Sequence, residues 1–483
     1  MFLAFIYCSL ILFFCFVLSI PFIIFGLKKH FINKRKLLSG DDTSDTINIA
    51  FFHPYCDAGG GGEKVLWSAI LALQKSYPNV KIVVYTGDLN ASPDEIIKRV
   101  YTRFNIKFLR EVEFIYLHKR KWLEHKRYPY FTLLSQSFGS LVVGLEALYA
   151  YLPDIYIDSM GYSFTLFLFS YIGGCTTACY IHYPTITREM VKRVSSRRVG
   201  QTNRAAVAQS PFLTSAKLLY YRSFAWLYSF CGTFADTVMV NSSWTEEHIN
   251  HLWGCNLSTH RVYPPCDTIA FKSLPQAPDI SDGGPIKITS VGQYRPEKDH
   301  PLQLQALYEL RRILPEDVWD RVKLVFIGSC RGSEDMERVK DMKDLMKHLS
   351  LENNVEFKVN IPFEELKSEL SSSMIGLHAM WNEHFGIAVV ECMAAGQIMV
   401  AHKSGGPKAD IIEESEGSRN GFLASDEFEY ARALATIIQM PSDARNKIRE
   451  AARSSVDRFS TEEFEKGLLR TLDPLVTRKV KSS

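Results

Sequence analysis

Short apolar runs that alternate with helix-like segments constrain this 483-residue chain more than any other feature. Residues 47–52 and 81–85 are apolar runs, and each leads through a loop into a segment of helical periodicity. The same order continues towards the C-terminus and is typical of parallel sheets whose strands are joined by crossover helices. We therefore predict further strands at residues 154–157, 178–181, 237–240, 286–291, 323–327, 355–359, 375–378 and 398–401.

A stretch rich in proline and glycine at residues 264–285 interrupts the alternation, and we interpret it as a domain linker. On either side of it the sequence predicts a doubly wound, Rossmann-like α/β domain, one over residues 47–263 and one over residues 286–458. A C-terminal helix and basic tail follow at residues 459–483. Helix caps are expected at Ser92 and Ser243, because a glutamate follows each of them three residues later.

The N-terminus carries a predicted transmembrane anchor at residues 1–27. Residues 2–27 contain no charged side chain, and about 20 apolar residues are enough to cross a bilayer core. A cleaved signal peptide has a basic start and a shorter apolar stretch, so cleavage is the weaker alternative, together with a buried core helix. Pro21 is expected to kink the helix or to end it early.

The charges beside this anchor predict its orientation. Five lysine and arginine residues lie within a basic and polar linker at residues 28–46, and none precedes the apolar run. By the positive-inside rule, we expect a single-pass protein with a short lumenal N-terminus and cytosolic domains. The glycosylation sequons at Asn90, Asn241 and Asn256 are therefore expected to stay unmodified. The lysines of the C-terminal tail also look like a dilysine retrieval signal, although such a tail arises easily by chance.

Composition excludes two classes of protein. The net charge of +3 includes +5 from residues 1–36, so the rest of the chain carries −2. A general nucleic-acid-binding protein would have a basic domain, and we expect no nucleic-acid partner. Ten cysteines without a CxxC pair argue against a disulfide scaffold and suit buried, reduced thiols.

Several stretches are candidate surfaces. The internal apolar stretches at residues 131–152, 162–174 and 218–240 are interpreted as helices packed on a sheet, and the alternative is a surface that dips into a membrane. The basic-aromatic stretches at residues 119–128 and 188–198 suit a solvated face. Contact with anionic lipid or with an acceptor diphosphate is the alternative for them.

A run of glycines forms the first candidate site. Gly60, Gly61 and Gly62 follow the first predicted strand and open a helix, where backbone amides favour a phosphate. The run lacks the Gly-Lys-Ser/Thr ending of a P-loop, and a plain flexible turn is the alternative. His182 ends a strand in the same half of the chain, which favours a functional role, and a structural role stays open.

The second half places charged residues after two of its strands. Arg295 and Lys298 follow the first of these strands, and two cations there suit a diphosphate, although a solvated basic turn is equally consistent. Glu383 lies in the loop after another strand, and Glu391 lies on the helix that Gly386 begins. Two carboxylates beside a helix start suit a polyhydroxylated ligand that is joined to a phosphate.

The sequence predicts neither a metal nor another cofactor. The chain has no Asp-x-Asp motif, and no group of histidine, cysteine and aspartate has metal-ligand spacing. The positive charges of Arg295 and Lys298 can take the place of a divalent cation.

Five separated blocks carry a resemblance to a known family, at residues 51–67, 159–165, 181–187, 292–303 and 380–396. Glu383 and Glu391 match the Glu-x7-Glu motif of the retaining glycosyltransferases of GT-B fold, and Arg295 and Lys298 match the basic pair of that family. In blocks such as GGGGEKVLW, IHYPTIT and MWNEHFGIAVVE, the chain most resembles the GDP-mannose-dependent alpha-1,2-mannosyltransferases of asparagine-linked glycosylation. The resemblance covers residues 47–472.

The resemblance implies a fold and an activity. The fold would be GT-B, with two Rossmann-like domains facing a cleft, plus the N-terminal transmembrane helix. The enzyme would transfer mannose from GDP-mannose, in alpha-1,2 linkage and with retention, to the dolichol-diphosphate-linked trimannosyl core oligosaccharide. It would add the fourth and fifth mannoses at the cytosolic face of the endoplasmic reticulum membrane. Membrane lipids and other mannosyltransferases would be its partners. The alternatives are a non-catalytic scaffold of such a complex and a UDP-sugar-dependent lipid glycosyltransferase of the same fold.

The family's residue roles carry over by position. Arg295 and Lys298 would hold the diphosphate of the donor and stabilise the charge of the leaving group. Glu383 would bind the mannose hydroxyls near the backbone amides of Phe385 and Gly386. The remaining donor-binding residues are Glu391, which would hold the ribose, and Gly60, Gly61 and Gly62, which would approach the phosphates. His182 would face the donor sugar and the acceptor, and it joins the predicted catalytic residues Glu383, Arg295 and Lys298.

Overall fold

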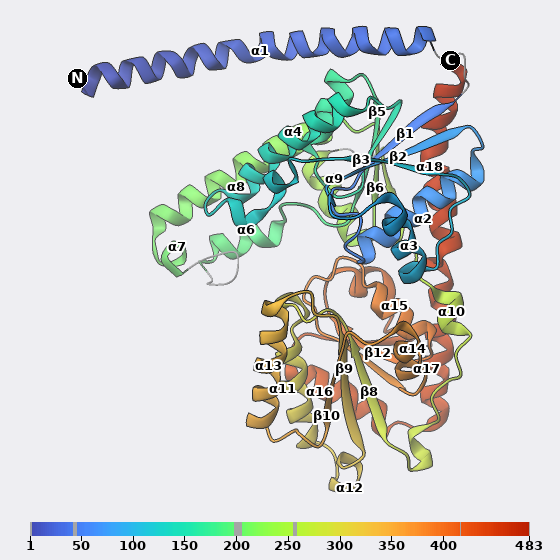
Figure 1. Ribbon diagram of the computed structural model, residues 1–483. Coiled ribbons are helices and arrows are strands. Elements are labelled where there is room, and N and C mark those ends of the chain that lie inside the picture. Colours follow the sequence, from blue (N-terminus) through green and yellow to red (C-terminus); the bar gives the residue numbers. More distant parts are fainter. Residues whose placement is uncertain (1, 42–45, 198–204, 255–257, 416, 483) are drawn as a thin grey trace. The chain divides into compact units, whose positions relative to one another are not determined.

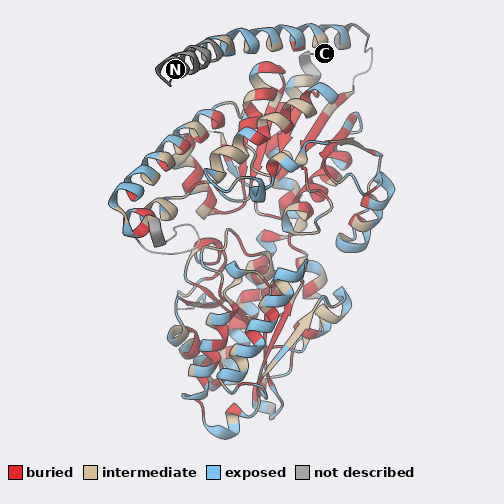
Figure 2. Ribbon diagram, turned by 60° about the vertical axis from the view of Figure 1, so that its left-hand side comes forward, coloured by how far each residue is buried: buried red, intermediate tan, exposed pale blue. Residues whose placement is uncertain are grey.

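The computed structural model describes residues 2–482 except residues 42–45, 198–204, 255–257 and 416, and it contains two compact units. The first unit comprises the described residues of Met1–Val240, Glu247–His260 and Leu468–Ser483. The second comprises those of Asn241–Glu246 and Arg261–Gly467. Within each unit a sheet is flanked by helices (Figure 1). Figure 2 shows that the strands are mostly buried, whereas many helices expose their outer faces.

Seven strands form the sheet of the first unit, in the order β3-β2-β1-β4-β5-β6-β7. The pairs from β3 to β6 are parallel, so the carboxyl ends of these strands meet at one edge. The strands are β1 (Ile47–Phe52), β2 (Val80–Thr86), β3 (Val112–Tyr116), β4 (Ile155–Asp158), β5 (Thr176–Ile181), β6 (Thr237–Val240) and β7 (Thr259–Arg261). The larger helices around them are α2 (Gly61–Ser76), α3 (Pro93–Phe104), α4 (Thr132–Ala150), α6 (Arg188–Ser195), α8 (Pro211–Gly232) and α9 (Ser243–Trp253).

Six parallel strands form the sheet of the second unit, in the order β10-β9-β8-β11-β12-β13. They are β8 (Ile286–Val291), β9 (Val322–Gly328), β10 (Val355–Val359), β11 (Ile375–His378), β12 (Ile398–His402) and β13 (Gly421–Ala424). The larger helices are α11 (His300–Arg311), α13 (Ser333–His348), α14 (Phe363–Ser371), α15 (Ile387–Ala394), α16 (Glu427–Gln439) and α17 (Ser442–Ser455). Both sheets therefore have the doubly wound strand order that the alternating pattern predicts.

The first helix, α1 (Phe2–Asp41), is continuous. It does not end at Pro21, and it runs through residues 28–41 of the segment expected to be a linker. A proline inside a helix removes one backbone hydrogen bond, and the neighbouring turns can keep the helix intact at that cost. The side chains of residues 2–17 lie outside the described part of the structure, so the transmembrane role of this helix stays a prediction.

The later turns of α1 pack on the first unit. The Phe31 side chain is fully buried, and the Arg35 guanidinium pairs with the Asp154 carboxylate at 3.3 Å. Further towards the N-terminus the apolar side chains are exposed instead, with Phe22 at 77% and Phe25 at 68%. One helix thus combines a docked, partly basic end with an apolar segment that the first unit does not cover.

The internal apolar stretches form helices, and only part of their surface is covered. Among the described residues, α4 is the one helix both long and apolar enough to cross a bilayer, and 33% of its 18-residue apolar window is buried. Length and composition alone are weak evidence for a membrane span. Helix α8 packs through Phe224 and Tyr228 but exposes Phe212, Leu219 and Trp226. The packed-helix interpretation holds for the inner faces and does not account for the outer face of α8.

The final helix joins both units. Helix α18 (Thr461–Ser482) begins in the second unit and belongs to the first from Leu468 onward. There the Tyr77 hydroxyl donates to the Asp473 carboxylate at 2.8 Å, and Leu472 is buried. The C-terminal helix is therefore a structural part of the first unit.

Three strands escape the sequence pattern: β3 and β7 in the first sheet and β13 in the second. Each lies at an edge of its sheet and is short, with 5, 3 and 4 residues respectively, so its apolar run is too brief to recognise. The cap at Ser92 is confirmed, but the one at Ser243 is wrong by one residue. Helix α9 starts at Ser243, and the Oγ of Ser242 accepts from the Thr245 amide at 3.1 Å. Ser243 instead donates to Asp410, through its amide at 2.9 Å and through its hydroxyl.

Candidate functional site

Each sheet has a topological switch point, and the residues singled out by the sequence lie near these two points. In the first unit the switch lies between β1 and β4, and in the second it lies between β8 and β11. Open parallel sheets bind ligands at the carboxyl ends of the strands beside such a point. The residues that directly follow these strands are therefore the natural candidates for a site in each unit.

The glycine run of the first unit forms a turn against His182. Gly60 is the N-cap of α2, and Gly61 and Gly62 form its first turn. Gly59 has a φ of +74°, a backbone conformation in which glycine is favoured. A Cβ on Gly62 would lie 3.5 Å from the Nε2 atom of His182. The structure thus brings the predicted phosphate-binding turn and His182 together at the start of a helix, whose first amides favour an anion.

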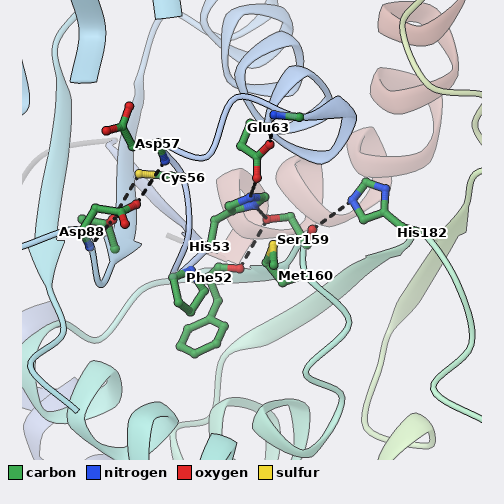
Figure 3. Close-up of polar contacts among 12 residues, drawn as sticks. Phe52, His53, Cys56, Asp57, Glu63, Asp88, Ser159, Met160 and His182 are labelled. Carbon is green, nitrogen blue, oxygen red and sulfur yellow. Dashed lines mark hydrogen bonds and ion pairs between the residues drawn. The ribbon is translucent and has the colours of Figure 1, made fainter. Parts of the chain in front are cut away.

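A buried histidine and a buried carboxylate lie beneath this turn (Figure 3). His53 directly follows β1 and is fully buried, and its Nε2 lies 3.6 Å from Oε1 of Glu63. The other oxygen of Glu63 accepts a hydrogen bond from the Gly60 amide, so the Glu63 side chain caps the start of α2. Burial by itself raises the pKa of Glu63, but His53 and the loop amides outweigh it and hold that pKa below its usual value. Glu63 is therefore a carboxylate at neutral pH.

Ser159 links this pair to His182. It follows β4, and its Oγ lies 2.8 Å from Nδ1 of His53. The backbone carbonyl of Ser159 lies 3.1 Å from Nε2 of His182. Because a carbonyl oxygen can only accept, Nε2 of His182 carries the hydrogen in this contact. A continuous set of contacts therefore runs from the glycine turn through Glu63, His53 and Ser159 to His182.

The neighbouring Asp158 is an unusual acid. It ends β4 and is fully buried, and its Oδ1 accepts from the amides of Met160 and Gly161 at 3.0 and 3.2 Å. Its Oδ2 is buried without a hydrogen-bond partner among the described residues. Burial raises the pKa of Asp158 to about 7, although the backbone amides oppose this shift.

In the second unit, two side chains and one backbone amide converge on the carboxylate of Glu383. Nζ of Lys298 donates to Oε2 of Glu383 at 2.5 Å, and Nε2 of His378 lies 3.1 Å from the same oxygen. The amide of His384 donates to the other oxygen, Oε1, at 3.2 Å. Glu383 is thus held by a cation, an imidazole and a backbone amide at the carboxyl end of β11.

The charges in this cluster follow from its burial and its pairing. Burial alone raises the pKa of Glu383, but the Lys298 charge and the His378 hydrogen bond outweigh it and hold that pKa well below its usual range. Burial lowers the pKa of His378, and Lys298 adds to this effect against the opposing influence of Glu383. The neutral His378 ring therefore donates from Nε2 to an ionised Glu383.

The loop that carries Glu383 is held from the far side by a second glycine loop. A Cβ on Gly405 would lie 2.1 Å from the Glu383 carbonyl, and that carbonyl accepts from the Gly406 amide at 2.7 Å. Gly386, with a φ of +112°, then turns the chain into α15. The Phe385 side chain is buried against Phe459 in the core, so the role predicted for Phe385 falls to its backbone amide.

Glu391 and Arg295 are the two remaining charged residues that the sequence predicts for the site in the second unit. Glu391 lies on α15 and is half-buried. The Arg295 side chain is 40% exposed, and its Nη1 lies 3.8 Å from the Glu297 carboxylate. The structure thus joins Lys298 to Glu383 directly and keeps Arg295 at the surface of the same unit, while the roles predicted for Arg295 and Glu391 stay predictions.

The sequence patterns do not single out His53, Ser159 and His378. Each lies at the carboxyl end of a strand beside a switch point, and that position is the signal that identifies them. An isolated serine or histidine is common in proteins, so the sequence signal becomes specific only when the strand order is known.

The described residues contain no cluster of side chains that could form a metal site. Across those residues, no group of three or more histidine, cysteine, aspartate or glutamate side chains is placed to hold a metal ion. The predicted independence of metal remains to be tested by activity.

Two family descriptions match most of the chain. "ALG11 mannosyltransferase N-terminus" matches residues 46–253, and "Glycosyl transferases group 1" matches residues 276–455. A GDP-Man:Man(3)GlcNAc(2)-PP-Dol alpha-1,2-mannosyltransferase of Homo sapiens is 49% identical over 94% of this chain and 92% of the relative. The protein of the same name from Dictyostelium discoideum is 43% identical over 90% of this chain and 86% of the relative.

Solved structures support the fold. Sucrose-phosphate synthase of Thermosynechococcus elongatus matches with a TM-score of 0.64 and 16% identity, over 89% of this chain and 100% of that one. Anabaena Alr3699/HepE in complex with UDP and glucose matches with a TM-score of 0.61 and 17% identity, over 88% of this chain and 99% of that one. These likenesses support a GT-B-like arrangement of two parallel-sheet domains along the chain.

Asp158→Asn tests the electrostatics of the first site. Because the pKa of Asp158 is raised from 3.8 to about 7 in the folded protein, its contribution favours the fold at low pH and is lost as the pH rises through that range. We expect the melting temperature of the variant, relative to wild type, to be higher at about pH 8 than at about pH 5. Asp344→Asn, at an exposed position of α13, is the matched control and should give a difference that does not change with pH. Equal pH dependence of the two variants would contradict the raised pKa.

Proposed function

Because the chain belongs to the family of GDP-Man:Man(3)GlcNAc(2)-PP-Dol alpha-1,2-mannosyltransferases, we propose that it transfers mannose from GDP-mannose, with retention, to the dolichol-diphosphate-linked trimannosyl core. It adds the fourth and fifth mannoses on the cytosolic face of the endoplasmic reticulum membrane. The observation that carries the proposal is the cluster of Lys298, His378 and Glu383 at the switch point of the second unit. A carboxylate held rigidly by three donors is suited to orient sugar hydroxyls.

The donor is held mainly by the second unit. Arg295 and Lys298 bind the diphosphate, and they stabilise the negative charge that grows on it as the bond to mannose breaks. Glu383 binds mannose hydroxyls, and the amides of Phe385 and Gly386 lie at the same loop. Because Lys298 contacts Glu383 directly, the cation and the sugar-binding carboxylate are fixed relative to each other before the donor arrives.

The first unit and Glu391 complete the donor site. Glu391, on α15, holds the ribose hydroxyls. The amides of the glycine turn at residues 60–62 approach the phosphates, and His182 faces the donor sugar and the acceptor hydroxyl. Support for this assignment comes from the contact between that turn and His182 within the first unit.

Retention is proposed to occur without a glycosyl-enzyme intermediate. The leaving phosphate takes the proton of the acceptor hydroxyl on the same face of the sugar, as is thought for retaining enzymes of this fold. Glu383 is engaged by Lys298 and His378, which suits a binding carboxylate better than a free nucleophile. The two-carboxylate scheme of glycosidases is therefore not transferred to Glu383 and Glu391.

Two rival functions remain distinguishable. A non-catalytic scaffold needs no ordered cation and carboxylate, yet Lys298 and Glu383 form a salt bridge at the expected site. A UDP-sugar-dependent lipid glycosyltransferase shares the fold, and the solved relative that binds UDP and glucose is only 17% identical. The named relatives at 43% to 49% identity favour GDP-mannose.

Membrane lipids are further proposed partners, and so are other mannosyltransferases of the pathway. The apolar face of α1 around Phe22 and Phe25 and the outer face of α8 with Leu219 and Trp226 are exposed. Apolar side chains of this kind favour the interface of a bilayer. Of the basic-aromatic stretch at residues 119–128, Arg120 is already bound by the Asp88 carboxylate, so it is a structural residue as well.

Transfer from labelled donors tests the function. Full-length protein with a trimannosyl lipid acceptor is incubated with labelled GDP-mannose and, separately, with UDP-sugars. We expect mannose to be transferred from GDP-mannose alone and to be transferred equally well in excess EDTA, because Arg295 and Lys298 supply the positive charge. Loss of transfer in EDTA that Mn²⁺ or Mg²⁺ restores would refute metal independence. Transfer from a UDP-sugar would favour the rival enzyme, and no transfer from any donor would favour the scaffold.

Substitution of the two glutamates separates their roles. Glu383→Gln keeps the shape but loses the charge that Lys298 and His378 bind, so we expect kcat to fall by about 10²–10³-fold. The proposed contact of Glu391 with the ribose is the same in the ground state and the transition state. Glu391→Gln weakens this contact, so the KM for GDP-mannose should rise with little change in kcat.

Steady-state kinetics decide between these outcomes. Glu450→Gln, at an exposed position of α17, is the matched control and should behave as wild type. If both Glu383→Gln and Glu391→Gln change only KM, the assigned roles are wrong.

The topology is tested by one exposed sequon and by protease. Asn90 is exposed, whereas Asn241 is buried and accepts from the Thr245 hydroxyl at 2.7 Å, and Asn256 lies outside the described residues. Asn90 is the sequon that the structure shows to be accessible, and we expect neither it nor the other two to carry a glycan. Protease added to sealed microsomes should digest the chain beyond about residue 40. An endoglycosidase-sensitive glycan at Asn90, or protection that only detergent removes, would place the domains in the lumen.

A further inference from the structure

The contact by which Glu63 caps α2 differs from an ordinary helix cap, because a buried histidine lies behind it. Glu63 accepts from the Gly60 amide, and Glu95 accepts from the Ser92 amide at the start of α3 at 2.9 Å. Glu95 is solvent-exposed, whereas Glu63 is 7% exposed and faces the buried ring of His53. A cap alone needs no buried partner, so the pairing of Glu63 with His53 calls for a second role.

The positions of the hydrogens allow His53 and Glu63 to hold the end of β1 and the glycine turn together. Glu63 is ionised, so the Nε2 atom of His53 that faces it must carry a hydrogen for the contact to be attractive. In the neutral ring, Nδ1 then accepts from the Ser159 hydroxyl. In the protonated ring, Nδ1 donates to Oγ of Ser159 instead, and the hydroxyl can donate to the Phe52 carbonyl at 3.3 Å. Either state keeps both contacts of His53.

The same chain of contacts sets the ring of His182. Ser159 bonds His53 through its side chain and His182 through its carbonyl. On its other side, His182 faces Gly62, which belongs to the turn that Glu63 closes. His182 is therefore bracketed by two elements, the Ser159 segment and the glycine turn, and both lead back to His53 and Glu63 (Figure 3).

We infer that His53 and Glu63 are positioning residues, which fix the glycine turn and the His182 ring relative to each other for mannosyl transfer. The inference rests on the proposed roles of that turn and of His182. Neither His53 nor Glu63 touches the reacting atoms in this scheme, since His53 is fully buried. They therefore affect kcat by setting the positions of the glycine turn and the His182 ring. They affect binding of the donor much less, because the second unit holds most of the donor.

Kinetics of full-length variants test this inference. We expect Glu63→Gln and His53→Gln each to lower kcat by about tenfold to a hundredfold while the KM for GDP-mannose stays within about threefold of wild type. Because the two residues act as one unit, the double variant should lose no more than the worse single variant. Glu63→Asp, which keeps the charge, should recover part of kcat.

The matched control is Glu95→Gln, which alters the same contact between a glutamate and the N-cap amide, at the start of α3, and should leave kcat unchanged. If His53→Gln does not fold, Ser159→Ala removes only a hydroxyl from the same contacts and should lower kcat in the same way. A kcat of Glu63→Gln within about twofold of wild type would overturn the inference. So would losses that multiply in the double variant. Absence of transfer by the wild-type protein in the same assay would instead count against the proposed function.

A second measurement does not depend on catalysis. Nitrogen NMR of the ¹⁵N-histidine-labelled full-length protein reports which ring nitrogen of His182 carries the hydrogen. We expect the Nε2–H form in the wild type and in Glu95→Gln, and a shifted or averaged His182 signal in Glu63→Gln. An unchanged His182 signal in Glu63→Gln would overturn the inference, whatever the transfer assay gives.

Discussion

Parallel strand pairing is the constraint on which the rest of this structure depends. Because each strand must return through a crossover helix, every strand of a sheet delivers its following loop to the same edge. In the first unit that edge brings together His53 after β1, Ser159 after β4 and His182 after β5. Residues more than a hundred positions apart thus become neighbours without any local sequence signal. The chemistry of each unit is a consequence of its strand order.

Electrostatic balance then decides which of these neighbours is charged. Burial opposes a charge on Glu383, but the Lys298 charge and the His378 hydrogen bond outweigh it and hold the pKa of Glu383 well below its usual range. Asp158 is opposed in the same way by burial, and its backbone amide donors do not outweigh it, so its pKa is raised to about 7. The two buried carboxyls therefore differ in protonation because charged and ring donors stabilise one of them and backbone amides alone stabilise the other. This supports a sugar-binding role for Glu383 and a structural one for Asp158.

The sequence predicted the elements with a regular apolar pattern and the segments whose residues are unusual for such a pattern. The central strands were identified because their apolar runs are long, and the glycine turn and the Glu-x7-Glu segment were identified because such residues are costly without a reason. Edge strands such as β13 were missed because a strand of 4 residues gives too short an apolar run to recognise. His378 was missed because a single histidine carries little information until β11 is placed beside β8. Local periodicity defines elements, whereas partner choice across the sheet depends on contacts far along the chain.

The two units share a local arrangement of a histidine and a carboxylate. In each, a histidine at the end of a strand faces a carboxylate from the loop or helix that follows, His53 with Glu63 and His378 with Glu383. Each carboxylate also accepts a backbone amide of its own loop. In each carboxylate one oxygen faces the histidine and the other accepts the amide, so the ionised group ties the loop to the strand. Moving the loop would leave a buried charge unpaired, which is costly. Both loops are thereby held by charge as well as by apolar packing.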